Sequence, residues 1–91
     1  MIKMMTPDAA ATLALDALTY LASVPDAFDR FADLSGLDRN TVRQRAQETA
    51  FLVAVLDFLL ADEQLLVEFC GGASIDPPAI HMARHALDRH E

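Results

Sequence analysis

Three polar side chains close to the C-terminus have a spacing that could bind a metal ion. His81, His85 and Asp88 lie at positions i, i+4 and i+7, which would place two imidazoles and a carboxylate on one helix face. The apolar residues of the same segment define the opposite face, so these three side chains are expected to lie in solvent. Cys70 has no partner cysteine and is expected to be a small buried hydrophobe. We therefore predict no metal site and no cofactor, with the trio kept as weak metal candidates.

A second group of side chains could read DNA. Residues 28–46 have the spacing of a helix-turn-helix, with Gly36 at the turn and a recognition helix expected over residues 38–45. Arginine and asparagine at the start of such a helix can hydrogen-bond to guanine and adenine edges. The candidate DNA contacts are Arg39, Asn40, Thr41 and Arg43. Residues 74–80 keep the same spacing without basic side chains, which favours an architectural role for both segments.

Asp57 is the one charged residue in the most apolar part of the chain, residues 50–61. A buried carboxylate there would have a raised pKa unless a cation paired with it. The same helical face carries Ala50, Ala54 and Ala61, which favours a thinly covered, partly exposed side. The histidines all lie in the C-terminal tail, and no serine has the context of a nucleophile elbow. We expect no catalytic residues and no enzyme activity.

Composition and charge predict a single all-α domain over residues 1–91. The chain is 53% hydrophobic, has few β-branched residues, and keeps glycine and proline between its apolar segments. Its net charge is −7, and residues 46–91 contribute two basic and eight acidic side chains. Negative charge opposes nucleic-acid binding, and the apolar run is too short to span a membrane. With one cysteine and no secretion signal, the expected location is the cytoplasm.

Local start and stop signals divide the chain into five or six short helices, which we expect to form a compact orthogonal bundle. The signals are proline at the first position of a helix, a capping Thr or Asp before it, and glycine after its last turn. They predict helices from 7 to before 25, then close to 25–35, 38–46, 49–61, 62–71 and from 76 nearly to the C-terminus. Residues 51–60 form the predicted central helix. The predicted core is Leu13, Leu18, Leu21, Phe28, Phe31, Leu37, Val42, Leu52, Leu56, Leu59, Leu66, Phe69, Ile80 and Leu87.

The two halves of the chain resemble each other at an offset of 38 residues. Long helix, short helix, glycine stop and a hydrophobe-Asp start follow one another in both halves. The pattern predicts an internal duplication with units over about 7–46 and 49–90. The identical pairs are Leu18 with Leu56, Leu21 with Leu59, Phe31 with Phe69, and Asp38 with Asp76.

Three motifs together resemble a small bacterial family known only as a domain of unknown function. They are Ser35-Gly36-Leu37-Asp38, Phe51-Leu52 leading into the stretch 56–63, and the Asp76-Pro77 helix start. The Leu-Asp-Phe-Leu-Leu block over residues 56–60 is the most specific of them, and the resemblance extends from about 9 to 87. It implies a stand-alone helical bacterial protein without a recognised catalytic site or cofactor, and it assigns no functional residues.

Two functions from different classes follow from these observations. The first is a non-catalytic protein-interaction or adaptor module that binds an unknown protein through an apolar groove or through the acidic face of its second half. The alternative is a small DNA-binding regulator with its helix-turn-helix at residues 28–46. If the central helix is apolar on every side, a homodimer could cover it. Neither nucleic acid nor a membrane is the expected partner.

Overall fold

The computed structural model describes residues 5–88, which form six α-helices and one 3₁₀ turn and contain no β-strand. The helices confirm the all-α class, and α1, α2, α4 and α6 lie within two residues of their predicted bounds. The elements are α1 (Pro7–Ala22), α2 (Pro25–Ser35), η1 (Arg39–Thr41), α3 (Val42–Arg45), α4 (Thr49–Ala61), α5 (Glu63–Ala73) and α6 (Pro77–Asp88).

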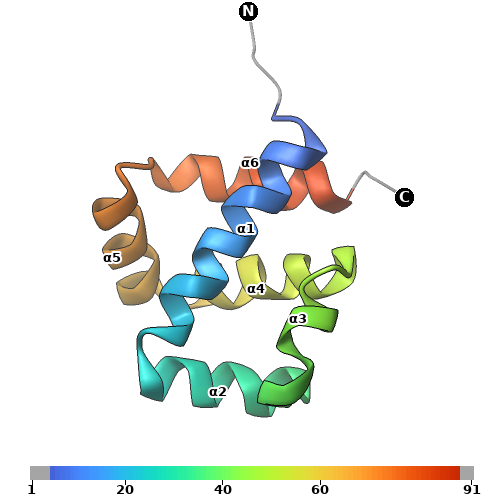
Figure 1. Ribbon diagram of the computed structural model, residues 1–91. Coiled ribbons are helices and arrows are strands. Elements are labelled where there is room, and N and C mark those ends of the chain that lie inside the picture. The colour runs from blue at the N-terminus through green and yellow to red at the C-terminus, as the bar shows by residue number, and fades with distance from the viewer. Residues whose placement is uncertain (1–4, 89–91) are drawn as a thin grey trace, which may run out of the picture.

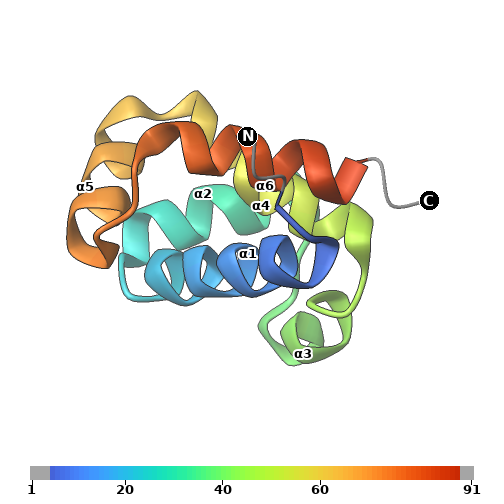
Figure 2. The ribbon, with the colours of Figure 1, turned by 90° about the horizontal axis from the view of Figure 1, so that it is seen from above.

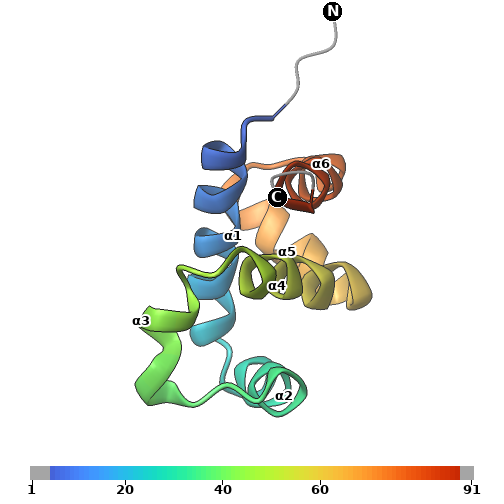
Figure 3. The same ribbon diagram turned by 90° about the vertical axis from the view of Figure 1, so that its right-hand side faces the viewer.

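One helix lies against a row of three others. In Figure 1, α6, α4 and α2 run across the view one below another, and α1 passes in front of α6 and α4 and ends near the start of α2. The three are nearly end-on in Figure 3, where α1 lies along one side of the row. Figure 2 shows α5 at one end of these helices and α3 toward their other end, on the side of α1. This arrangement is the orthogonal bundle that the sequence predicts.

The start of α1 shows why the local signals were sufficient there. Thr6 caps the helix, because its hydroxyl oxygen accepts a hydrogen bond from the backbone N–H of Ala9 at 3.1 Å, and proline occupies the first turn. Ala10, Ala14 and Ala17 are fully buried on one face. Their small side chains allow close packing, and α1, α4 and α6 make the most extensive contacts in the fold.

Twelve of the fourteen predicted core residues are buried, and the structure also buries Phe51, Val55 and several alanines that the predicted core does not include. Val42 and Leu66 are half-buried, whereas the other predicted core residues are buried. In α5 the buried positions are Leu65, Phe69 and Cys70. The offset of 38 residues between the halves predicts Leu66 in the core, but the buried residue is Leu65, one position earlier. Leu65 and Phe69 are four residues apart and therefore lie on one face of the helix.

The predicted helix over 38–46 is not continuous. Asp38 caps it as expected, accepting a hydrogen bond from the backbone N–H of Asn40 at 2.9 Å, but a 3₁₀ turn precedes the four residues of α3. α5 continues past its two glycines and ends at Ala73. Its C-cap residue is Ser74, which has a left-handed φ of 57°. Gly36 ends α2 with a φ of 68°, as its sequence position predicts.

Candidate interaction surface

The face of α4 that points away from the core is thinly covered. Ala50, Ala54, Asp57, Phe58 and Ala61 share this face, and each is exposed or half-buried, whereas the opposite face is buried. The Asp57 side chain is 47% exposed. This confirms the interpretation of Asp57 as a partly exposed residue on an alanine-rich side and excludes a buried, isolated carboxylate.

Beside this face lies an open groove between α2 and α4. We call it the α2–α4 groove, and its volume is about 270 Å³. Its lining consists of Phe31, Leu34 and Ser35 from α2 and Ala54, Asp57 and Phe58 from α4.

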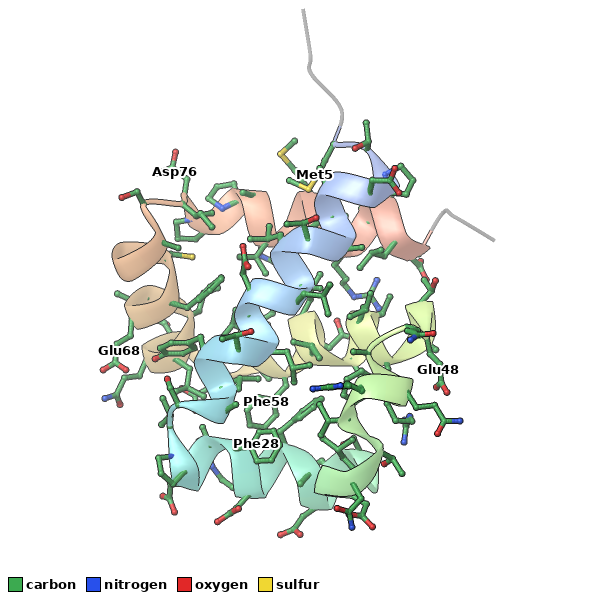
Figure 4. The ribbon with its side chains drawn as sticks, viewed as in Figure 1. Met5, Phe28, Glu48, Phe58, Glu68 and Asp76 are labelled. Atoms are coloured by element: carbon green, nitrogen blue, oxygen red, sulfur yellow. The ribbon has the colours of Figure 1, made fainter. Side chains whose placement is uncertain are left out.

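The floor of the α2–α4 groove is aromatic. The rings of Phe31 and Phe58 meet edge to face with their centroids 5.3 Å apart, and Phe31 also packs on Phe51 at 5.6 Å. Figure 4 shows Phe58, together with Phe28, in the space between α4 and α2. The Ser35 hydroxyl donates to the carbonyl of Phe31 at 2.8 Å, so it does not make the groove more polar. Aromatic contacts of this kind fix the floor rigidly.

Leu34 stands at the edge of the groove and is 78% exposed. A leucine exposed to this extent gains little from folding, since stabilisation scales with the apolar area removed from water. Leu15, Val67 and Met82 are the other large hydrophobic residues with exposed side chains among residues 5–88, and all are covered more than Leu34. The groove therefore combines an apolar floor with the most exposed large hydrophobic residue that the structure describes.

Ion pairs border the groove. Arg84 of α6 donates from Nε and Nη2 to the two carboxylate oxygens of Asp57, the second bond being 3.3 Å long. The hydrogen bond to Asp57, followed by the charge of that carboxylate, raises the pKa of Arg84, and Asp88 adds a weaker pairing at 3.8 Å. On the other side, Arg30 lies over the Phe58 ring at 5.6 Å.

The second of these arginines also joins two helices. Arg30 donates from Nη2 to Oδ2 of Asp62 at 3.2 Å, which links α2 to the start of α5. Both arginines that border the groove are thus engaged with carboxylates of the same chain. The lining of the groove is mainly apolar, and its one ionisable group, Asp57, is held by Arg84.

The three weak metal candidates do not form a ligand set. His81 and His85 are exposed on α6, and the Asp88 carboxylate lies beside Arg84. Across the part of the chain that the structure describes, no group of three or more His, Cys, Asp or Glu side chains could hold a metal ion.

The candidate DNA contacts lie on a short and partly occupied segment. Asn40 and Arg43 are exposed, and the hydroxyl of the half-buried Thr41 donates to the carbonyl of Asp38 at 2.9 Å. Arg45 lies over the Phe51 ring at 5.0 Å and 3.2 Å from Glu48. The side chain of Arg39 lies outside the described part. No recognition helix of several turns forms, and the DNA-binding hypothesis stays a prediction.

The family is decided by a match along nearly the entire chain. A family model described as "Protein of unknown function (DUF3572)" matches residues 7–90, which include all six helices. The chain belongs to this family. The family resemblance drawn from the three motifs is therefore confirmed. Searches of curated proteins and of solved structures found no match.

Two further findings on this DUF3572 chain concern membrane-spanning helices and Cys70. No helix in residues 5–88 is long and apolar enough to cross a membrane. Cys70 is buried, as predicted, and desolvation, followed by the charge of Asp76, raises the pKa of its thiol. Because the thiolate is the reactive form, a raised pKa lowers the reactivity of this cysteine.

Sequence reasoning did not single out the groove in this DUF3572 chain. The available signal was Leu34, an apolar residue among the polar positions of α2, three residues after the predicted core residue Phe31. An exposed leucine alone is ordinary on protein surfaces. Its meaning depends on Phe58 and Ala54, which α4 brings beside it only in the folded chain.

Proposed function

We propose that this protein is a non-catalytic protein-interaction module that binds its partner through the α2–α4 groove. The observation that carries the proposal is Leu34, which is 78% exposed at the edge of a groove with an aromatic floor. An apolar groove with a charged border is the usual composition of a protein–protein contact, with an apolar centre and a polar rim.

The size of the groove supports a protein partner. Its volume of about 270 Å³ lies below the range of roughly 300–1,000 Å³ typical of pockets for small organic ligands. A space of this size takes one or two large apolar side chains from a partner. Energetically dominant contacts are usually such anchors in well-packed pockets, and Phe58 with Arg30 above it provides residue types that recur at them.

The chemistry of the lining supports a role without catalysis. Acid–base and nucleophilic mechanisms need two cooperating groups within hydrogen-bond reach, such as a nucleophile and a base. The lining residues offer one carboxylate, Asp57, and its oxygens accept hydrogen bonds from Arg84. The Ser35 hydroxyl is directed to a backbone carbonyl.

Site-specific photo-crosslinking tests the proposal. A photoreactive phenylalanine analogue is placed at position 34, and in a matched variant at position 15, another exposed leucine on α1. Crosslinking in the native cells, followed by mass spectrometry, should identify a protein captured from position 34 and not from position 15. The captured protein, once purified, should bind the wild-type chain and lose roughly tenfold or more in affinity for Leu34→Ser.

The control and the contrary results are equally specific. Leu15→Ser should leave the affinity unchanged, because Leu15 is not a lining residue of the groove. Equal capture from both positions, or unchanged affinity for Leu34→Ser, would refute the groove as the binding site.

A further inference from the structure

We infer that the occupant of the α2–α4 groove is a basic amphipathic helix of another protein, an inference that rests on the proposed function. The proposed function requires only that the groove bind a protein. The charge around the groove and the arrangement of its two helices specify which kind of segment fits.

The charge argument starts from the sequence that forms the groove. Residues 46–83, which include all of α4 and α5, contain six acidic residues and no lysine or arginine. On α2, the exposed Asp26 and Asp33 make no ion pair with any other residue in the described ranges. The cations at the border, Arg30 and Arg84, are already paired with Asp62 and Asp57. Helices α2, α4 and α5 together therefore carry six acidic residues against one arginine, Arg30.

Electrostatic complementarity then selects the partner. Lysine and arginine on the flanks of a bound segment would be attracted by this excess of negative charge, which speeds association and fixes the orientation of the segment. An acidic segment would be repelled by it. A second copy of this chain is disfavoured for the same reason, since each copy has a net charge of −7 and a two-fold contact would bring two negatively charged surfaces together.

The arrangement of the helices favours a helical segment. α2 and α4 run side by side in the row seen in Figures 1 and 3, and the groove is lined by the last part of α2 and the middle of α4. The outer face of α4 carries Ala50, Ala54 and Ala61, whose small side chains would let another helix approach closely. In the helix-in-groove mode, apolar residues at i, i+3 and i+4 enter such a groove. One of these anchors would contact Leu34 and Phe58.

Two designed peptides test this inference directly. Both have about 14 residues, enough to span α4 as a helix of roughly 20 Å, and both have the same leucine and phenylalanine stripe. The remaining positions are lysine and arginine in one peptide and glutamate in the other. Fluorescence anisotropy should show binding of the basic peptide and at least roughly tenfold weaker binding of the acidic one.

Variants of the protein separate groove binding from general attraction between opposite charges. Ala54→Glu adds negative charge but places a larger side chain in the groove, so it should weaken the basic peptide roughly tenfold although simple attraction would increase. Leu34→Ser should weaken it as well, whereas Leu15→Ser should not. Circular dichroism of each variant checks that it is folded. Chemical shifts perturbed by the peptide should lie on α2 and α4.

The contrary outcomes point to different conclusions. No binding of the basic peptide, or equal binding to Ala54→Glu and wild type, overturns the inferred partner. Stronger binding of the acidic peptide also overturns the inferred partner. In each of these cases, crosslinking from position 34 would still support the proposed function as an interaction module. Self-association of the wild-type chain that Leu34→Ser abolishes would identify a second copy as the occupant and overturn the inference. Failure of the crosslinking itself would remove the proposed function.

Discussion

The third helices of the two halves, α3 and α6, follow similar signals but differ in length and packing. Gly36 and Ser74 both have left-handed backbones, and Asp38 and Asp76 both follow two residues later. From there α6 continues for 12 residues, whereas α3 ends after four. The duplication itself stays a prediction, since its second unit extends beyond the described residues. The comparison teaches that start signals alone do not determine how far a helix runs.

The difference follows from the apolar residues available after the start. α6 buries Ile80, Ala83 and Leu87, which recur at helical spacing on one face against α1 and α4. α3 offers the half-buried Val42 and then Arg43. A short helix gains most of its stability by packing an apolar face against the rest of the protein. α3 has no such face beyond Val42, so the helix does not extend further.

The two sides of α4 are packed differently. α6 packs extensively along α4 and reaches its outer face through the Arg84–Asp57 pair, whereas α2 contacts α4 much less. The α2–α4 groove lies on this sparsely packed side. The four-residue α3 lies toward one end of these helices, on the side of α1 (Figure 2).

Truncating one apolar anchor in each helix gives the largest expected difference. Ile80→Ala should lower the free energy of unfolding by about 2–5 kcal/mol, because Ile80 is fully buried and its removal leaves a cavity. Val42→Ala should lower it by about 1 kcal/mol or less, since its side chain is half exposed. Urea denaturation followed by circular dichroism measures both. Equal losses would show that α3 is as much a part of the core as α6.

Substitutions at Gly36 and Ser74, both of which have a left-handed backbone, should change the free energy of unfolding less, and the two changes should have opposite signs. Gly36→Ala should lower the free energy of unfolding by about 1 kcal/mol, because alanine disfavours a φ of 68°, although the added methyl group would touch nothing. Ser74→Gly should raise it by less than about 1 kcal/mol, since glycine accepts that backbone but gains entropy in the unfolded chain. Thermal unfolding measures both shifts. A destabilised Ser74→Gly variant would show that the serine contributes more than its backbone strain.

The sequence predicts the helices well where the deciding interaction is local. Thr6, Pro25 and Gly36 act through their own backbone or one turn away, and the bounds of α1 and α2 follow from them. Helical spacing likewise predicts most of the core. The extent of α3 is not predictable in this way, because Asp38 indicates only where a helix begins.

The candidate surface depends on contacts between residues distant in the sequence. Asp57 and Arg84 are 27 positions apart, and only the packing of α6 on α4 brings them together. The alanine-rich face of α4 was readable from helical spacing. The groove beside it required the position of α2, and thus of Leu34, which no local pattern provides.

The smallest expected effect concerns Asp62, which connects the two halves beside the groove. Its carboxylate accepts hydrogen bonds from the backbone N–H of Leu65 and from Arg30, each at 3.2 Å. The bond from Leu65 is the main cause that lowers the pKa of Asp62 below its ordinary value of 3.8, and the bond and charge of Arg30 lower it further. A lowered pKa in the folded state contributes stability above about pH 4, and this stability is lost as the pH falls through the folded-state value.

Asp62→Asn keeps a capping side chain without the charge, so its free energy of unfolding should fall less steeply between about pH 5 and pH 2 than that of the wild type. Arg30→Gln should retain most of the wild-type slope, because it leaves the stronger bond from Leu65 in place. Urea denaturation at each pH measures these slopes. If Arg30→Gln flattened the slope as much as Asp62→Asn, the ion pair between the halves, and not the local cap of α5, would be the main source of the acid sensitivity at this position.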